Sequence, residues 1–337
     1  MNTSLTMFML FLVTLLAACR NPESVLQIQT PADHSGMFIV NEGGFAGGGS
    51  LSFYDAQHDT LYNNIAGINE HWIFPNDMKI AGSKGYVAVE GLDRIDLIDL
   101  ATYQVSGSIT LPTSSGPEFL SANDSLLCSA NANGTVSVIR LSDDSVTWTS
   151  PSVVGFPGGI ILLGSRIAVM DAGLYPRAGQ FIKILDPIAK TVVDSLSTGG
   201  SPGPVAAVNE KIYVVLTSGS AILQINLLTR TVEDSMGLPG YYSDLTTDGQ
   251  SLFALTSDSI AKISVAPLRL VNSSFVKRTT GIYFYSLGAD PGTGDLYVSN
   301  IMTSIGAGEL ELYNSTGRSQ RTPAATGTFP GAFDWKP

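Results

Sequence analysis

One pattern of short strands and loops recurs along this chain at intervals of about 40 to 48 residues. Each copy opens with a β-branched or aromatic run, passes through a loop containing Gly, Asn or Asp into a second apolar alternation, and closes with a turn and a further strand. No stretch shows a sustained helical period. Because such a copy can bury its apolar faces only against its neighbours, the period predicts a β-propeller. The second strands of seven copies begin at residues 38–40, 86–88, 127–129, 167–169, 213–215, 253–255 and 297–299.

The two ends of the repeat predict how the ring closes. The first copy begins at its second strand, near Met37, whereas residues 329–335 have the pattern of a first strand without a blade of its own. Pairing these two segments would cover strand edges that otherwise stay open. The sequence therefore predicts an all-β fold: a seven-bladed β-propeller with four-stranded antiparallel blades, closed by the C-terminal strand, in which residues 36–337 form one domain.

Residues 1–18 indicate a lipoprotein signal peptide. The apolar run at 7–16 is too short to cross a bilayer, which takes about 20 helical residues. It ends in LAAC at residues 16–19, which resembles the lipobox of bacterial lipoproteins, and this resemblance implies that Cys19 carries lipid. The alternative is a secretory signal cut elsewhere, with Cys19 an ordinary residue. Residues 19–35 are polar and fit a tether between lipid and domain.

The direction of the strands sorts the loops onto two faces. Strands within a blade alternate in direction, so the loops joining second to third strands emerge on the same side as the loops joining one blade to the next. We call this side the loop face, and the opposite side, which carries the tight turns, the turn face. The turns are short and leave little room for a site, whereas the loop face carries long loops rich in aromatic residues.

The loop face has the composition of a ligand-binding funnel. Aromatic side chains provide rigid stacking area, and a few polar groups orient what is bound. An alternative role for such aromatic residues is to wedge between blades. The residues we expect to contact a ligand are Glu42, Trp72, Phe74, Glu90, Tyr175, Arg177, Tyr241, Tyr242, Tyr283 and Tyr285.

Three aspartates in first strands, Asp77, Asp244 and Asp334, invite two interpretations. They could line the central channel and hold a cation, since carboxylates are common ligands of such ions. Carboxylates spread around a ring do not match a known coordination geometry, however. We therefore expect a hydrogen-bonded structural role for them.

Composition gives little support to catalysis. Of the three histidines, His34 lies in the tether, His58 in a turn on the turn face, and His71 alone near the funnel, which excludes a site with several imidazole ligands. No Ser/His/Asp spacing supports a triad. We expect no enzyme, metal or cofactor, with a propeller hydrolase or lyase as an alternative lacking identified residues.

With Cys19 lipidated, Cys128 has no partner and should be a buried hydrophobe. A net charge of -11 argues against nucleic acid.

Residues 38–45 (FIVNEGGF) and 49–55 (GSLSFYD) resemble the opening of YncE-like, surface-layer-type propeller lipoproteins of Bacteroidetes. The resemblance implies a protein anchored by lipid in the outer membrane, which captures a small molecule on its loop face and passes it to a TonB-dependent outer-membrane transporter. One branch of the group captures cobalamin, which makes a corrinoid a candidate ligand. The alternative is a non-enzymatic scaffold that binds a protein or a glycan through the same face. The sequence leaves open the ligand, the membrane leaflet and the oligomeric state.

Overall fold

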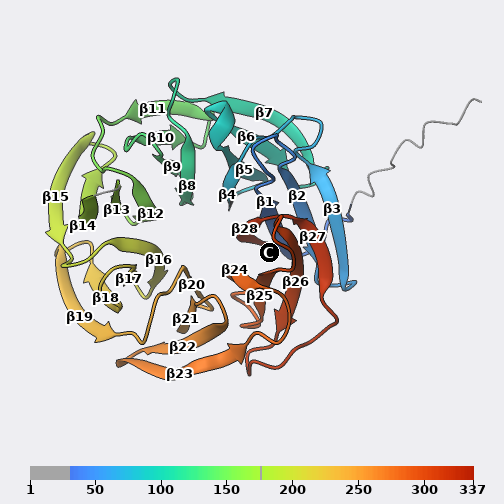
Figure 1. Cartoon of the computed structure of the whole chain (residues 1–337). Helices are drawn as coiled ribbons and strands as arrows, with labels where there is room; N and C mark the ends of the chain where they lie inside the picture. Colours follow the sequence, from blue (N-terminus) through green and yellow to red (C-terminus); the bar gives the residue numbers. More distant parts are fainter. Residues whose placement is uncertain (1–30, 175–176) are drawn as a thin grey trace, which may run out of the picture.

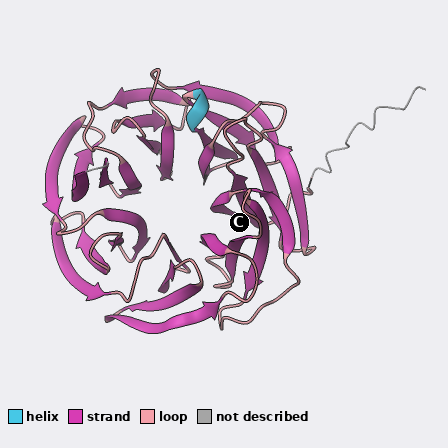
Figure 2. Ribbon diagram, viewed as in Figure 1, coloured by secondary structure: helices cyan, strands magenta, loops and turns pink. Residues whose placement is uncertain are grey.

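The structure is a computed structural model that describes residues 31–174 and 177–337. The described residues form seven four-stranded antiparallel sheets, and Figure 1 shows them arranged in a ring, which confirms the predicted seven-bladed propeller. The signal segment, Cys19 and Tyr175 lie outside the described residues. Within the described part, the only helical element is a single 3-10 turn, η1 (Glu90–Leu92), drawn in cyan in Figure 2. No helix in that part is long and apolar enough to cross a membrane.

The blades follow one another along the chain, and each runs from an inner strand at the channel to an outer strand at the rim. The first blade consists of β28 (Pro330–Lys336), β1 (Gly36–Asn41), β2 (Ser50–Asp55) and β3 (Thr60–Ala66). The second consists of β4 (Pro75–Ala81), β5 (Lys84–Val89), β6 (Arg94–Asp99) and β7 (Gln104–Thr110). The third consists of β8 (Pro117–Ala122), β9 (Leu126–Asn131), β10 (Val136–Arg140) and β11 (Ser145–Thr149).

The remaining four blades repeat this order. The fourth consists of β12 (Pro157–Leu163), β13 (Arg166–Leu174), β14 (Arg177–Asp186) and β15 (Thr191–Ser197). The fifth consists of β16 (Pro202–Val208), β17 (Lys211–Leu216), β18 (Ala221–Asn226) and β19 (Thr231–Gly237). The sixth consists of β20 (Asp244–Thr247), β21 (Ser251–Leu255), β22 (Ser259–Val265) and β23 (Leu268–Lys277). The seventh consists of β24 (Tyr283–Ala289), β25 (Leu296–Ile301), β26 (Ala307–Tyr313) and β27 (Ala324–Thr328).

The C-terminal strand closes the ring as the sequence predicts. β28 pairs antiparallel with β1, with Phe38 opposite Asp334 and Ile39 opposite Phe333. The apolar core lies between neighbouring blades, because successive side chains of a strand point to opposite faces of its sheet. Each blade-to-blade interface holds one cluster of buried residues, such as Phe38 and Phe53 of the first blade packed with Met78 of the second.

Polar side chains on the inner strands join neighbouring blades. A carboxylate or hydroxyl oxygen accepts a hydrogen bond from a backbone N–H of the next inner strand. Because the inner strand is the edge of its sheet, this N–H has no neighbouring strand on the channel side, and the side chain provides the missing acceptor. This is the hydrogen-bonded role expected for Asp77, Asp244 and Asp334. The pairs are Asp77 with Leu120 (2.8 Å), Ser121 with Leu162 (2.9 Å), Asp244 with Leu287 (2.8 Å) and Asp334 with Ile80 (2.6 Å).

Candidate functional site

A cavity of about 1290 Å³ occupies the central channel and extends to the loop face. All seven inner strands contribute to its lining, which makes it a product of ring closure and not of one blade. Segments far apart in the sequence meet at its loop-face end. Among the residues expected to contact a ligand, the cavity brings together Glu42, Tyr241, Tyr242, Tyr283 and Tyr285.

The four tyrosines differ in how much surface they offer. Tyr241, in the loop between β19 and β20, has 63% of its surface exposed, whereas its neighbour Tyr242 packs into the core between the fifth and sixth blades. Tyr283 and Tyr285, two residues apart on β24, are half-buried, and their ring centroids lie 6.1 Å apart in an edge-to-face arrangement. Stacking area at the cavity therefore comes from Tyr241, Tyr283 and Tyr285.

A buried carboxyl group anchors the wall beside these rings. The Tyr285 hydroxyl donates to the Glu42 carboxylate, with both oxygens 2.8 Å away. Burial raises the pKa of Glu42 to about 7, although the bond from Tyr285 partly opposes this change. Glu42 therefore changes between its protonated and ionised forms near neutral pH.

Asn76 links two further carboxyl groups at the same end of the channel. Its amide nitrogen lies 3.1 Å from Glu90 Oε2 and 2.8 Å from Glu118 Oε2. Burial, together with the negative charges of Glu90 and Glu42, raises the pKa of Glu118 to about 8. We call Glu42, Glu90 and Glu118 the glutamate cluster.

Deeper in the channel, one ammonium group faces several carboxylates. Lys79 Nζ donates to Asp77 Oδ1 at 2.9 Å. Burial opposes the charge on Lys79, but the carboxylates of Asp77 and Asp334 outweigh this effect and raise the pKa of the lysine. Burial also raises the pKa of Asp244 and of Asp334 to about 6 in each case. The channel is therefore polar and predominantly acidic.

The structure corrects the expected role of Trp72. Its side chain is 0% exposed and belongs to the core between the first and second blades, so it has no free face for stacking on a ligand. Its indole Nε1 donates to Asp96 Oδ2 at 2.7 Å. The cause is a fold-back of the loop after β3, where Gly67 adopts a φ of 97° and its backbone crosses the indole so closely that a Cβ atom would collide with the ring.

The other expected residues lie outside the cavity lining. Phe74 is half-buried and packs edge-to-face against the exposed Phe45, with 5.2 Å between the ring centroids. Glu90 begins η1 and accepts a hydrogen bond from Asn76, which lines the cavity. Arg177 is exposed at the start of β14. Five of the ten expected residues thus lie on the cavity, and ligand contact at these positions stays a prediction.

Sequence reasoning missed Asn76 and Glu118, although a signal for them exists. Five inner strands begin with proline, and the residue after each proline is skipped in the pairing with the next strand: Asn76, Glu118, Gly158, Gly203 and Gly331. At a β-bulge of this kind the extra residue does not pair with the neighbouring strand, and its side chain points in a new direction. At position 331 a Cβ atom would displace the Glu42 carboxylate from its present place, so the glycine there makes room for that group. The polar members of this set stand at the mouth of the channel.

Fold and cavity together define this protein as a seven-bladed β-propeller with a polar central site. The chain belongs to the family described as "Domain of unknown function (DUF5074)", which it matches over residues 35–329. A search of the curated proteins by sequence finds no match.

Solved structures share the fold at low sequence identity. A quinonprotein alcohol dehydrogenase-like protein from Bacteroides thetaiotaomicron is 15% identical with a TM-score of 0.65, covering 89% of this chain and 78% of that one. A protein from Lactobacillus plantarum is 16% identical with a TM-score of 0.67, covering 90% and 100%. Kuenenia stuttgartiensis hydrazine synthase is 15% identical with a TM-score of 0.62, covering 77% and 88%. At this identity the similarity concerns the fold alone.

Proposed function

We propose that this protein binds a small molecule in the cavity at the loop face. The observation that carries the proposal is the convergence of Glu42 and Tyr285, 243 residues apart, with Tyr241 and Tyr283 on one wall of a closed ring. A cavity of about 1290 Å³ exceeds the roughly 300–1,000 Å³ of common ligand pockets and suits a large metabolite. Tyrosine rings supply stacking area, and the carboxyl groups orient polar atoms of the ligand.

The charges of the cavity favour a particular ligand chemistry. Five carboxyl groups line it, those of Glu42, Asp77, Asp244, Asp258 and Asp334, against the single ammonium group of Lys79. Carboxylates accept hydrogen bonds and attract positive charge, so a ligand with several N–H donors or a cationic centre fits better than an anion. A corrinoid, with its amide side chains and positively charged metal centre, has this chemistry.

The cellular role in this proposal rests on the sequence. The lipobox at residues 16–19 supports a lipid anchor in the outer membrane, and the resemblance to propeller lipoproteins supports delivery of the ligand to a TonB-dependent transporter. Surface and periplasmic leaflets are both compatible with these signals. An enzymatic role has no residue set that supports it in the part of the chain described.

A second candidate function has one observation in its favour. Apolar side chains stand exposed at the loop face: Phe45 between β1 and β2 at 96%, Ile305 between β25 and β26 at 78%, and Leu174 at the end of β13 at 64%. Where exposed apolar side chains form one contiguous patch, that patch marks a protein interaction site. An envelope scaffold that binds a protein or a glycan through these loops is therefore the alternative.

Calorimetry separates the two functions. The purified protein is titrated with cobalamin, cobinamide, haem and a panel of glycans, and compared with the Tyr283→Ala variant. Truncation of a central aromatic contact typically costs about 2 kcal/mol, so binding should weaken more than tenfold. Tyr62→Ala removes a half-buried tyrosine from the outer strand β3 and should leave the affinity unchanged. Absence of heat with every small molecule, combined with capture of an envelope protein that depends on Phe45, would replace the first proposal by the second.

A further inference from the structure

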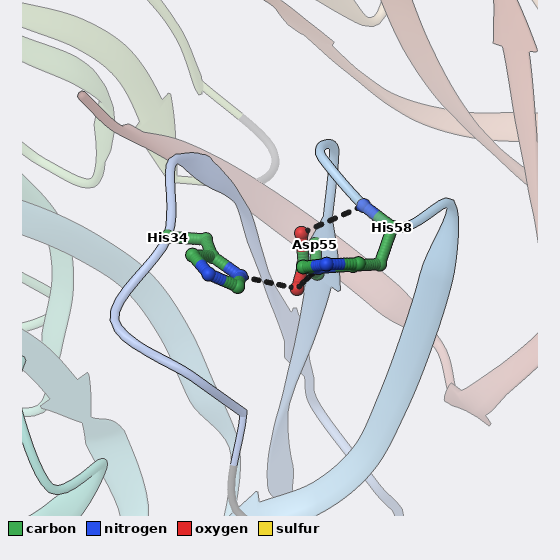
Figure 3. Close-up of side chains that lie close together, drawn as sticks. All are labelled: His34, Asp55 and His58. Atoms are coloured by element: carbon green, nitrogen blue, oxygen red, sulfur yellow. Dashed lines mark hydrogen bonds and ion pairs between the residues drawn. The ribbon is translucent and has the colours of Figure 1, made fainter.

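Two of the three histidines meet around one aspartate on the turn face, far from the cavity (Figure 3). His34 precedes β1, Asp55 ends β2, and His58 lies in the turn between β2 and β3. The Asp55 Oδ2 atom lies 2.8 Å from His34 Nδ1 and 3.0 Å from His58 Nδ1, and the two imidazole centroids are 4.6 Å apart. The sequence-based exclusion of a site with several imidazole ligands considered the loop face, where His71 stands alone, whereas on the turn face two imidazoles come together.

The three side chains match the donor set of a transition-metal site. Imidazole nitrogen and carboxylate oxygen are the usual ligands of Zn²⁺ and related ions. The three ligand atoms all lie within 4.8 Å of one another. In a tetrahedral zinc site, bonds of 2.0–2.2 Å place neighbouring ligand atoms roughly 3.3 Å apart. The two His–Asp separations of 2.8 and 3.0 Å need to widen by only a few tenths of an ångström, and the imidazole nitrogens, which lie within 4.8 Å of each other, then turn toward the shared ion.

The carboxylate is held in place before any ion arrives. Asp55 Oδ1 accepts hydrogen bonds from the backbone N–H groups of Gln57 at 2.9 Å and His58 at 3.1 Å, which fix the plane of the carboxylate. Second contacts of this kind orient metal ligands and sharpen affinity. The Asp55 side chain is 1% exposed, whereas those of His34 and His58 are 24% and 54% exposed. Ions can thus enter from the solvent side, where water completes the coordination.

We propose that His34, Asp55 and His58 form a binding site for a divalent transition-metal ion of the Zn²⁺ type, which fastens residues 31–35 to the blade that closes the ring. Binding through Nδ1 uses the tautomer of each neutral imidazole that carries its proton on Nε2, so the proton moves from Nδ1 to Nε2 by exchange with solvent and metal–ligand bonds replace the two hydrogen bonds. Two ligands belong to the first blade and the third to the segment ahead of it, so the ion joins chain segments that no sheet hydrogen bond connects.

The surroundings of His34 indicate what such a link would hold. The segment ahead of β1, which the sequence predicts as the last part of the tether, contacts the propeller at three further points. Lys336 Nζ lies 2.6 Å from Asp33 Oδ1, the Tyr103 hydroxyl donates to Ala32 O at 2.8 Å, and the N–H of Ala56 donates to Ser35 O at 3.3 Å. These contacts join the segment to β28, to the second blade and to the β2–β3 turn. A bound ion would lock it against the seam between the first and last strands.

Metal titration of the full-length, tag-free protein tests the proposal. After treatment with a chelator, Co²⁺ is added and its visible absorption recorded, and Zn²⁺ binding is measured by calorimetry. We expect one ion per chain, intense absorption typical of tetrahedral Co²⁺, and a higher melting temperature with Zn²⁺. An asparagine series provides matched variants, because the amide can still donate to Asp55 but is a poor ligand for these ions. His34→Asn and His58→Asn should each lower the affinity at least tenfold and abolish the gain in melting temperature.

His71→Asn is the control, since His71 is exposed on the loop face and its φ of 53° is one that asparagine adopts readily. It should bind Zn²⁺ as the unmodified protein does. Should the His34→Asn variant unfold, His58→Asn decides, because that residue is more than half exposed. Lack of stoichiometric binding, or equal loss of affinity in His71→Asn and His58→Asn, would overturn the proposal. Neither result bears on ligand binding at the loop face.

Discussion

Raising the pH from 6 to 9 should destabilise this protein through the glutamate cluster. The pKa values of Glu42 and Glu118 are raised from 4.5 to about 7 and about 8, mainly because both carboxyl groups are buried. A carboxyl group whose pKa is higher in the folded state stabilises the fold below its unfolded pKa. That contribution disappears as the pH rises through the folded pKa. Between pH 6 and 9 the unfolded chain is ionised at both positions, while the folded chain is losing protons.

The size of the effect follows from these values. Integrating the difference in bound protons from pH 6 to 9 gives a loss of about 1 kcal/mol for Glu42 and about 3 kcal/mol for Glu118. The free energy of unfolding should therefore fall by roughly 4 kcal/mol over this range, a large share of the typical stability of about 5–15 kcal/mol of a folded domain. The pKa values near 6 of Asp244 and Asp334 give additional losses with the same sign.

Urea denaturation followed by tryptophan fluorescence at four pH values measures this dependence. The Glu118→Gln variant keeps an oxygen that accepts from Asn76 but has no titrating group, so its stability should fall by about 3 kcal/mol less than that of the unmodified protein. Glu210→Gln changes an exposed glutamate in the turn before β17 and should preserve the whole dependence. The reasoning is refuted if stability stays constant or rises from pH 6 to 9, or if Glu118→Gln matches the unmodified protein.

Other consequences of the structure can be checked separately. Trp72→Ala should lower the free energy of unfolding by about 3–5 kcal/mol in a urea titration, because it leaves a cavity in the core. An unchanged urea midpoint would contradict the burial of Trp72. Deleting residues 329–337 should expose the edge of β1 and cause aggregation in size-exclusion chromatography, whereas a monomer of unchanged melting temperature would contradict closure by β28. Burial raises the pKa of the Cys128 thiol, so iodoacetamide should modify it only after unfolding, as mass spectrometry can show. An alkyne fatty acid fed to cells should label the protein but not its Cys19→Ala variant, and an unlabelled native protein would remove the lipid anchor from the proposal.

The fold could be predicted from the sequence because its signals are local and repeated. Alternation with period two assigns the strands, and the position of Met37 inside an incomplete copy indicates that the ring closes with the C-terminal strand. A shift of one residue would move every side chain of a strand to the opposite face of its sheet, against the other neighbouring blade, so the packing of the blades specifies the register. The seven interblade clusters are the direct consequence of this alternation.

The site was harder to predict because burial in loops depends on contacts between distant segments. Trp72 and Tyr241 both lie in blade-to-blade loops rich in aromatic residues, yet one is buried beneath Gly67 and the other is largely exposed. Sequence composition does not distinguish these outcomes. The meeting of His34 with His58 likewise required the segment ahead of β1 to fold back onto the turn face. The prolines at the start of the inner strands are a local sequence feature that could have been used, since they precede the bulges at Asn76 and Glu118.

The pairing of β1 with β28 determines how the ring responds to mechanical load. Gly36 lies opposite Lys336, so the start of β1 and the end of β28 lie together at one edge of the sheet. A force that separates the two chain ends acts along the hydrogen bonds and breaks them one after another, as a zipper opens. The ion pair between Asp33 and Lys336 stands ahead of the first of these bonds and bears the load before them. A force on the N-terminal segment alone, with the protein held at its loop face, instead pulls β1 along its own axis. The hydrogen bonds to β2 and β28 then share the load in shear, so the direction of pulling decides whether the propeller opens easily or resists.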